Sequence, residues 1–279
     1  MPPSVQPLTI AFAMLYDITP YQRLVAWKGI SLLALKPLES EDDIPVDWDW
    51  DELVGIPIPP RGLEIGLAQG PYPLSLIRGF FDRLNATLNT IQPKGNRLDI
   101  VAEHTLNRYC VVLSFFEQVF RSNAYLQGPL MQPTVKRSVE ELLAIAQDSW
   151  IDDLSQMFSL FYERYHHLLT QPHVLNPTFA GSSDVGGADA DLVVDGCLID
   201  IKASVSPQIK AEYLYQLAGY VLLDYDDKLQ IGSFGIYMAR QGMLFTWPVA
   251  EFLRQLTGDD TISLVSLRQE FRTLCQANS

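Results

Sequence analysis

The stretch that decides the fold is residues 187–204, which read GADADLVVDGCLIDIKAS. Asp195-Gly196, in its middle, is typical of a two-residue hairpin turn, because both central positions of a type I′ turn require a positive φ. The flanking runs favour strands, so we expect a hairpin with strands at about 188–194 and 197–203. A two-residue turn also determines the pairing, and it predicts that Val194 lies opposite Cys197.

The acidic residues of this hairpin are predicted to gather on one face. The pairing puts Asp191 opposite Asp200 and Asp189 opposite Lys202, and side chains alternate between the two faces of a strand. The other face is predicted to be apolar and to consist of Ala190, Leu192, Val194, Cys197, Ile199 and Ile201. Like charges on one face destabilise a sheet, and a hard divalent cation would compensate them. We therefore expect a metal site at the three aspartates, with Lys202 beside it as a point charge for a water molecule or a phosphate oxygen.

The segment after the hairpin is predicted to supply further polar groups. Residues 207–225 read as a helix with Tyr213, Gln216 and Tyr220 at positions i, i+3 and i+7. Gln216 and Tyr220 share a face of such a helix. A helix packed beside the hairpin would present both side chains toward Lys202.

The remaining elements indicate an α/β protein with a mostly helical N-terminal region. Apolar spacing predicts helices at about 73–90, 99–122 and 150–170, and Ser138 begins a capping box for another helix. Further strands are expected at 174–179, 231–239 and 243–247, and helices at 249–256 and 264–275. From residue 150 the predicted order is α-β-β-β-α-β-β-α. A boundary near 125–137 is predicted to divide the chain into an N-terminal region, 1–130, and a second domain, 131–279.

Composition narrows the class of protein. The chain has 279 residues, of which 48% are hydrophobic and 19% are charged, as in a globular protein with a real core. Its net charge of −13 argues against a large basic surface for nucleic acid, although it leaves room for a local basic groove. The three cysteines are far apart and form no Cys-x-x-Cys pair, which argues against a disulfide framework or a thiolate zinc site. We expect a cytoplasmic protein without a membrane span.

Three groups of residues together resemble a known family. Asp191, then Asp200-Ile201-Lys202, then Gln216-Leu-Ala-Gly-Tyr220, in this order of elements, resemble the PD-(D/E)XK nuclease superfamily of restriction-endonuclease-like enzymes. The trailing Gln-x-x-x-Tyr is similar to the branch that contains RecB-type and CRISPR-associated exonuclease domains. The resemblance covers about residues 150–247. It implies an α-β-β-β-α-β core with a mixed sheet flanked by helices, and hydrolysis of DNA phosphodiesters with Mg²⁺ or Mn²⁺.

The resemblance also implies a role for each matching residue. Asp191 would be the first metal carboxylate, Asp200 the second, and the Ile201 carbonyl a further ligand. Asp189 competes with Asp191 for the first position, and Asp191 is preferred because the predicted pairing puts it directly opposite Asp200, where the two carboxylates could share one ion. Lys202 would assist the attacking water. Gln216 and Tyr220 would position Lys202 or the DNA phosphate.

The chain departs from the family pattern at several positions. Ala190 stands where the superfamily is named for Pro, and Ala203 follows Lys202 where the RecB branch usually has Thr. That branch often has an upstream histidine on a helix, but no recognisable motif selects one here. The candidates for an upstream acid or histidine therefore stay open, and they are Glu163, His166, His167 and His173.

Two further hypotheses compete with an enzyme that acts alone. Residues 39–52 contain eight acidic residues and no basic one, which is typical of a solvated loop or of a docking element for a basic protein partner. The chain would then be a non-catalytic nuclease-fold or acidic adaptor protein. Alternatively, the domain would cleave nucleic acid only inside a complex, because an acidic chain attracts DNA weakly. A role in defence or repair would follow from fold-level analogy alone.

Overall fold

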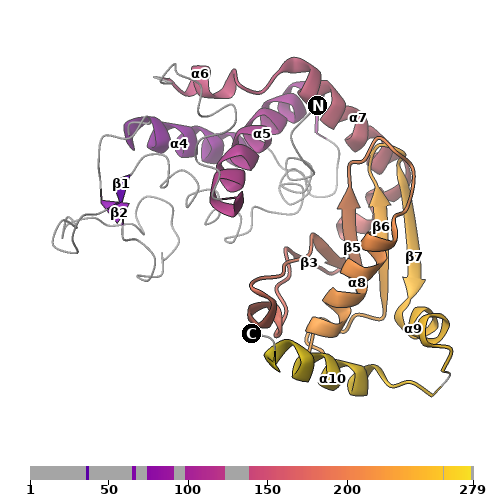
Figure 1. Cartoon of the computed structure of the whole chain (residues 1–279). Helices are drawn as coiled ribbons and strands as arrows, with labels where there is room; N and C mark the ends of the chain where they lie inside the picture. The colour runs from indigo at the N-terminus through magenta and orange to yellow at the C-terminus, as the bar shows by residue number, and fades with distance from the viewer. Residues whose placement is uncertain are drawn as a thin grey trace. The chain divides into compact units, whose positions relative to one another are not determined.

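The computed structural model describes residues 36–37, 65–66, 74–90, 98–122, 138–259 and 261–277 (Figure 1). The chain divides into two compact units, residues 1–155 and residues 156–279. The predicted boundary near 125–137 and the acidic segment 39–52 lie outside the described residues. Within the described part, no helix has the length and apolar character needed to cross a membrane.

The first unit is mainly helical where it is described. It contains α4 (Leu74–Thr90), α5 (Ile100–Ser122) and α6 (Val139–Leu143), together with a small antiparallel pair, β1 (Lys36–Pro37) and β2 (Ile65–Gly66). The helices predicted at 73–90 and 99–122 are confirmed.

Local capping explains where two of these helices begin. The Asp99 carboxylate accepts hydrogen bonds from the amides of Val101 and Ala102, which satisfies donors that have no partner inside α5. At the start of α6, the Ser138 hydroxyl accepts a hydrogen bond from the Glu141 amide at 3.2 Å, as the capping box predicts.

The second unit is built on a mixed five-stranded sheet in the order β3-β4-β5-β6-β7 (Figure 1). The strands are β3 (His173–Leu175), β4 (Leu192–Val194), β5 (Cys197–Lys202), β6 (Ser233–Met238) and β7 (Met243–Pro248). Strands β5 and β6 pair in parallel, and the other neighbours pair antiparallel. The parallel pair follows from the crossover helix α8 (Ala211–Leu223), which carries the chain back before β6 begins.

Helices flank this sheet, so the α/β class is confirmed. Helix α7 (Asp148–Tyr165) contains the division between the two units, and short 3₁₀ helices follow at η3 (His166–Thr170) and η4 (Ser182–Val185). Helices α9 (Val249–Thr257) and α10 (Leu264–Ala277) close the chain. The order of strands and helices from residue 150 agrees with the prediction as far as β7, and both helices predicted at 249–256 and 264–275 follow it as α9 and α10.

The two faces of the sheet are covered by different helices. On one face, Leu198 and Ile236 pack in a buried cluster with Leu217 of α8. On the other face, the ring of Tyr237 lies against Phe161 of α7 with ring centres 5.6 Å apart. Figure 1 shows α8 lying over the sheet beside β5 and β6.

The predicted hairpin is confirmed at its turn. Asp195 and Gly196 have φ values of 47° and 71°, as a type I′ turn requires, and Val194 pairs with Cys197. The pairing then ends at Leu192 opposite Ile199.

The predicted pairs further from the turn, Asp191 with Asp200 and Asp189 with Lys202, are not part of the ladder between β4 and β5. Asp189 instead forms an isolated bridge with Thr178. The preceding segment bonds to the strand start: the Asn176 amide donates to the Asp191 carbonyl, and the Ala190 amide donates to the Pro177 carbonyl.

The predicted division of the hairpin into a polar and an apolar face is wrong for Ala190. Ala190 was expected on the face opposite the acidic residues, but it packs with Val193 and Leu198 in the cluster under α8. In addition, all three residues of β4 are buried, so both faces of the hairpin lie inside the protein. Before Leu192 the chain bonds to residues 176 and 177 instead of to β5, so the alternation predicted from the turn does not continue there. The strand predicted at 174–179 is also shorter, at His173–Leu175.

Candidate active site

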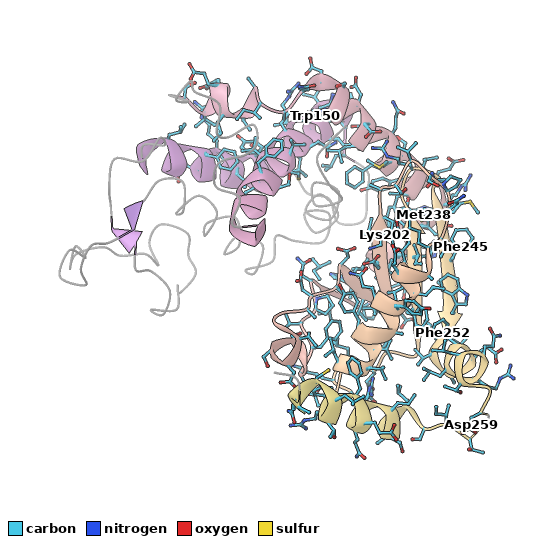
Figure 2. All side chains as sticks on the ribbon, viewed as in Figure 1. Trp150, Lys202, Met238, Phe245, Phe252 and Asp259 are labelled. Atoms are coloured by element: carbon cyan, nitrogen blue, oxygen red, sulfur yellow. The ribbon has the colours of Figure 1, made fainter. Side chains whose placement is uncertain are left out.

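Lys202 lies at the centre of a cluster of polar side chains at the carboxyl end of β5. Its ammonium nitrogen lies 2.6 Å from Oδ2 of Asp200 and donates a hydrogen bond of 3.0 Å to Oε1 of Gln216. The same nitrogen lies 4.8 Å from the centre of the Tyr213 ring, which is the geometry of a cation–π contact. Figure 2 labels Lys202 close to Met238, its partner in the parallel pair of β5 with β6. Three partners therefore hold the ammonium in one position.

The network continues from Gln216 along α8. Nε2 of Gln216 donates a hydrogen bond of 2.8 Å to the hydroxyl oxygen of Tyr220. An ammonium can only donate, so Lys202 determines which end of the Gln216 amide faces it. The Tyr220 ring stacks on Phe179 with centres 5.2 Å apart and planes at 16°. Because the Tyr220 oxygen accepts from Gln216, its own proton is directed to another acceptor.

Burial and charge shift the pKa values of two groups here. Burial raises the pKa of Asp200, and the Lys202 ammonium partly opposes this increase. Burial also raises the pKa of Tyr220 to about 12, with smaller contributions from the carboxylates of Asp200, Asp191 and Asp189. Tyr220 thus remains a hydrogen-bond donor at neutral pH, and all three predicted acidic residues act on it electrostatically.

Asp191 is held against the strand that carries Asp200 and Lys202. Its Oδ2 accepts a hydrogen bond of 2.6 Å from the Ile201 amide. Along an extended strand the amide and carbonyl of one residue point to the same side, and those of the next residue point to the other; the Lys202 carbonyl accepts from the Ala239 amide on the β6 side. The Ile201 carbonyl therefore points to the side on which Asp191 lies, beyond the first residue of β4.

The carboxylate and carbonyl oxygens of this site are suitable ligands for a hard divalent cation. Oδ2 of Asp200 is buried and, apart from its ion pair with Lys202, has no hydrogen-bond partner in the described part of the chain. Among the described residues, no three His, Cys, Asp or Glu side chains gather closely enough to hold an ion, so Asp189 does not complete a set of three with Asp191 and Asp200. Mg²⁺ commonly uses one or two protein carboxylates and completes its shell with water and phosphate oxygens. Two carboxylates and the Ile201 carbonyl are consistent with that preference.

The sequence left open which residue is the upstream acid or histidine of the site. All four candidates have exposed side chains: Glu163, His166, His167 and His173. The His166 ring contacts the Tyr162 carbonyl, and the His173 ring contacts the Gln171 carbonyl. These contacts lie within their own segments and do not select one of the four for the site, so that choice stays a prediction.

Two aromatic residues of the site were not assigned a role from the sequence. Tyr213 carried a usable signal, because it lies three residues before Gln216 on a predicted helix and shares its side of that helix. Phe179 had no such signal in the sequence. Its contact with Tyr220 joins the segment before η4 to α8, and residue spacing within one segment does not indicate a contact between distant segments.

Comparison of this chain with protein-family models, curated proteins and solved structures found no significant match. Its function must therefore be inferred from the groups that the fold brings together. These are the carboxylates of Asp191 and Asp200, the Lys202 ammonium, and the polar groups of Gln216 and Tyr220.

Proposed function

We propose that the second compact unit is a metal-dependent nuclease of the PD-(D/E)XK type that hydrolyses phosphodiester bonds, with DNA as its substrate. The observation that carries the proposal is the position of Lys202, which lies between Asp200 and Gln216 while Gln216 binds Tyr220. These residues come from β5 and α8, and the superfamily resemblance assigns all of them to one site.

The topology adds support at the level of architecture. Helix α7 is followed by the antiparallel strands β3, β4 and β5, then by α8 and the parallel strand β6. This order agrees with the α-β-β-β-α-β core that the resemblance implies. Strand β7 and the last two helices extend that core.

In this proposal Asp191, Asp200 and the Ile201 carbonyl hold Mg²⁺ or Mn²⁺. A divalent cation supplies a Lewis acid for the phosphodiester and lowers the pKa of a nearby water molecule. The chain's own groups orient the reactants. Lys202 places a positive charge beside Asp200, where it attracts a phosphate oxygen and the attacking water.

Gln216 and Tyr220 hold the Lys202 side chain in position for this role. The Lys202 side chain is 17% exposed, so its protein partners rather than solvent determine where the ammonium lies. Gln216 accepts one of its protons and thereby limits its rotation. Tyr220, which stays protonated at neutral pH, can donate its own proton in a hydrogen bond to a phosphate oxygen.

Cleavage assays with the full chain test the proposal. Linear, circular and single-stranded DNA are incubated with Mg²⁺ or Mn²⁺, using wild type, Asp200→Asn and Lys202→Ala. We expect both substitutions to slow cleavage by at least about a hundredfold, since each removes a group that acts on the reacting atoms.

Asp195→Asn is the matched control, because it makes the same chemical change in the same hairpin. Asn tolerates the positive φ of that turn position, so this variant should cleave like wild type. Cleavage that survives Asp200→Asn and Lys202→Ala would refute the assignment. A folded wild-type protein that cleaves no substrate with either metal would favour the non-catalytic adaptor hypothesis.

A further inference from the structure

The segment that joins β5 to α8 carries a lysine to which the proposed mechanism gives no role. Lys210 directly precedes α8, and its side chain is exposed. We propose that Lys210 binds a phosphate of the DNA backbone close to the phosphate at Lys202. The inference rests on the proposed nuclease function and adds a substrate-binding residue to the same site.

The Tyr213 ring places Lys210 near the proposed catalytic cation. The Lys202 ammonium lies 4.8 Å from the centre of this ring, and the Lys210 ammonium lies 6.0 Å from the same centre. Both distances are within the range of a cation–π contact. The two nitrogens are therefore separated by at most the sum of these distances. Phosphates of one DNA strand follow each other about every 3.4 Å along the duplex axis, so about three nucleotide steps or fewer span this separation.

Hydrogen bonds position the backbone of the segment that carries Lys210. After β5, Nε2 of Gln241 donates a hydrogen bond of 3.2 Å to the Val205 carbonyl. At the start of α8, the Lys210 carbonyl accepts a hydrogen bond of 3.1 Å from the Tyr213 amide. Lys210 is thus attached to the first turn of the helix that also presents Gln216 to the site.

The charges of the two lysines are compensated differently. Lys202 forms an ion pair of 2.6 Å with Asp200. Lys210 forms no ion pair within the part of the chain that the structure describes, although the exposed Glu212 follows two positions later. Because the whole chain carries 33 acidic and 20 basic residues, its attraction for DNA must come from such local positive charges. Lys210 therefore supplies, at the edge of the site, the charge that a phosphodiester backbone needs.

Lys228 offers a matched comparison beyond the other end of α8. Its side chain is also exposed, and it likewise forms no ion pair with a described residue. Helix α8 has 13 residues, so its two ends lie about 20 Å apart at about 1.5 Å per residue. Lys228 therefore differs from Lys210 in its position, and it has the same charge and a similarly exposed side chain.

The salt dependence of DNA binding tests the inference. Binding of the full chain to labelled DNA is measured in EDTA, so that no cleavage occurs, over a series of salt concentrations. Each phosphate contact contributes about 0.9 to the slope of log K against log salt. Lys210→Gln should therefore lower the slope by about 0.9 and weaken binding about eightfold at about 0.1 M salt. The weakening should be the same for DNA of different sequences, because a phosphate contact does not read the bases.

Two control variants separate a phosphate contact from a general charge effect. Lys228→Gln makes the same chemical change away from the site and should leave the slope close to that of wild type. Lys210→Arg keeps the charge and should retain the wild-type slope. Equal weakening by Lys210→Gln and Lys228→Gln would overturn the inference, and so would wild-type protein that fails to bind DNA at low salt.

The result can be separated from the outcome of the cleavage test. A wild-type slope in Lys210→Gln, combined with cleavage that depends on Asp200, would reject the role of Lys210 and leave the nuclease proposal intact. A lowered slope in Lys210→Gln without any cleavage by wild type would support the phosphate contact and reject the nuclease. Tighter binding of RNA than of DNA of the same sequence would overturn the assignment of DNA as the partner.

Discussion

Replacing Lys202 by Met would remove the cation beside Asp200 and leave a side chain of similar length. The Asp200 side chain is 6% exposed, so water cannot take the place of the lost ammonium. Removing one partner of a buried ion pair costs about 3–5 kcal/mol, because the other charge is left uncompensated. Lys202 retains some exposure itself, so we expect the low end of that range, about 3 kcal/mol, in the free energy of unfolding near neutral pH.

The pH dependence of this loss identifies its cause. Burial raises the pKa of Asp200, and Lys202 opposes the increase, so the Lys202→Met variant should have a still higher Asp200 pKa. A carboxyl group whose pKa is raised by folding stabilises the fold fully below its unfolded pKa, near 3.8. That contribution is lost as the pH rises through the folded pKa. The deficit of Lys202→Met should therefore be larger at about pH 8 than at about pH 5.

Urea unfolding of the full chain at both pH values measures the effect. Asp200→Asn is the complementary variant, since it removes the buried charge and leaves only the more exposed Lys202. We expect it to unfold at a urea concentration equal to or above that of wild type at the higher pH. The double variant should recover most of the stability lost in Lys202→Met. A loss below about 1 kcal/mol, or an equal loss at both pH values, would refute the reasoning.

Three further predictions concern residues around the site and the core. Tyr213→Phe keeps the ring face toward Lys202 and should retain activity, whereas Tyr213→Leu should lower kcat by about two- to thirtyfold with little change in KM, as steady-state cleavage kinetics would show. Gly235→Ala would put a Cβ 2.7 Å from the Phe245 carbonyl oxygen, so we expect a loss of about 1–3 kcal/mol in urea unfolding; wild-type stability would contradict the packing of β6 on β7. Arg268→Met leaves the buried Asp224 without its cation and should cost about 3–5 kcal/mol in the same assay, and an unchanged midpoint would show that this pair does not stabilise α10 on α8.

Features that depend on neighbours in the chain were predictable. The Asp195-Gly196 turn follows from the two positive φ values that such a turn needs, and it determines the pair Val194–Cys197. The boundaries of α4 and α5 follow from apolar spacing and from the cap at Asp99. The spacing of Gln216 and Tyr220 predicted that they share a face, and their hydrogen bond confirms it.

Features that depend on competition between distant segments were not predictable. Continuing the hairpin alternation backwards would place Ala190 opposite the acidic residues, but the Ala190 amide bonds to Pro177 and the side chain enters the core under α8. The start of β4 at Leu192 depends on this interaction with a preceding segment. A local sequence pattern does not indicate whether the end of a strand will bond to the preceding segment or to the neighbouring strand.

The chemistry of the candidate site therefore has two origins. Residue types and their spacing in 187–220 were enough to identify candidate site residues, because turns and helices depend on residues close together in the sequence. These candidates are Asp191, Asp200, Lys202, Gln216 and Tyr220. Packing of α8 on the sheet was needed to bury Asp200, to bring Gln216 within 3.0 Å of Lys202 and to stack Tyr220 on Phe179. Burial and long-range contact depend on how the whole sheet and its helices exclude water, and a local pattern carries no information about either.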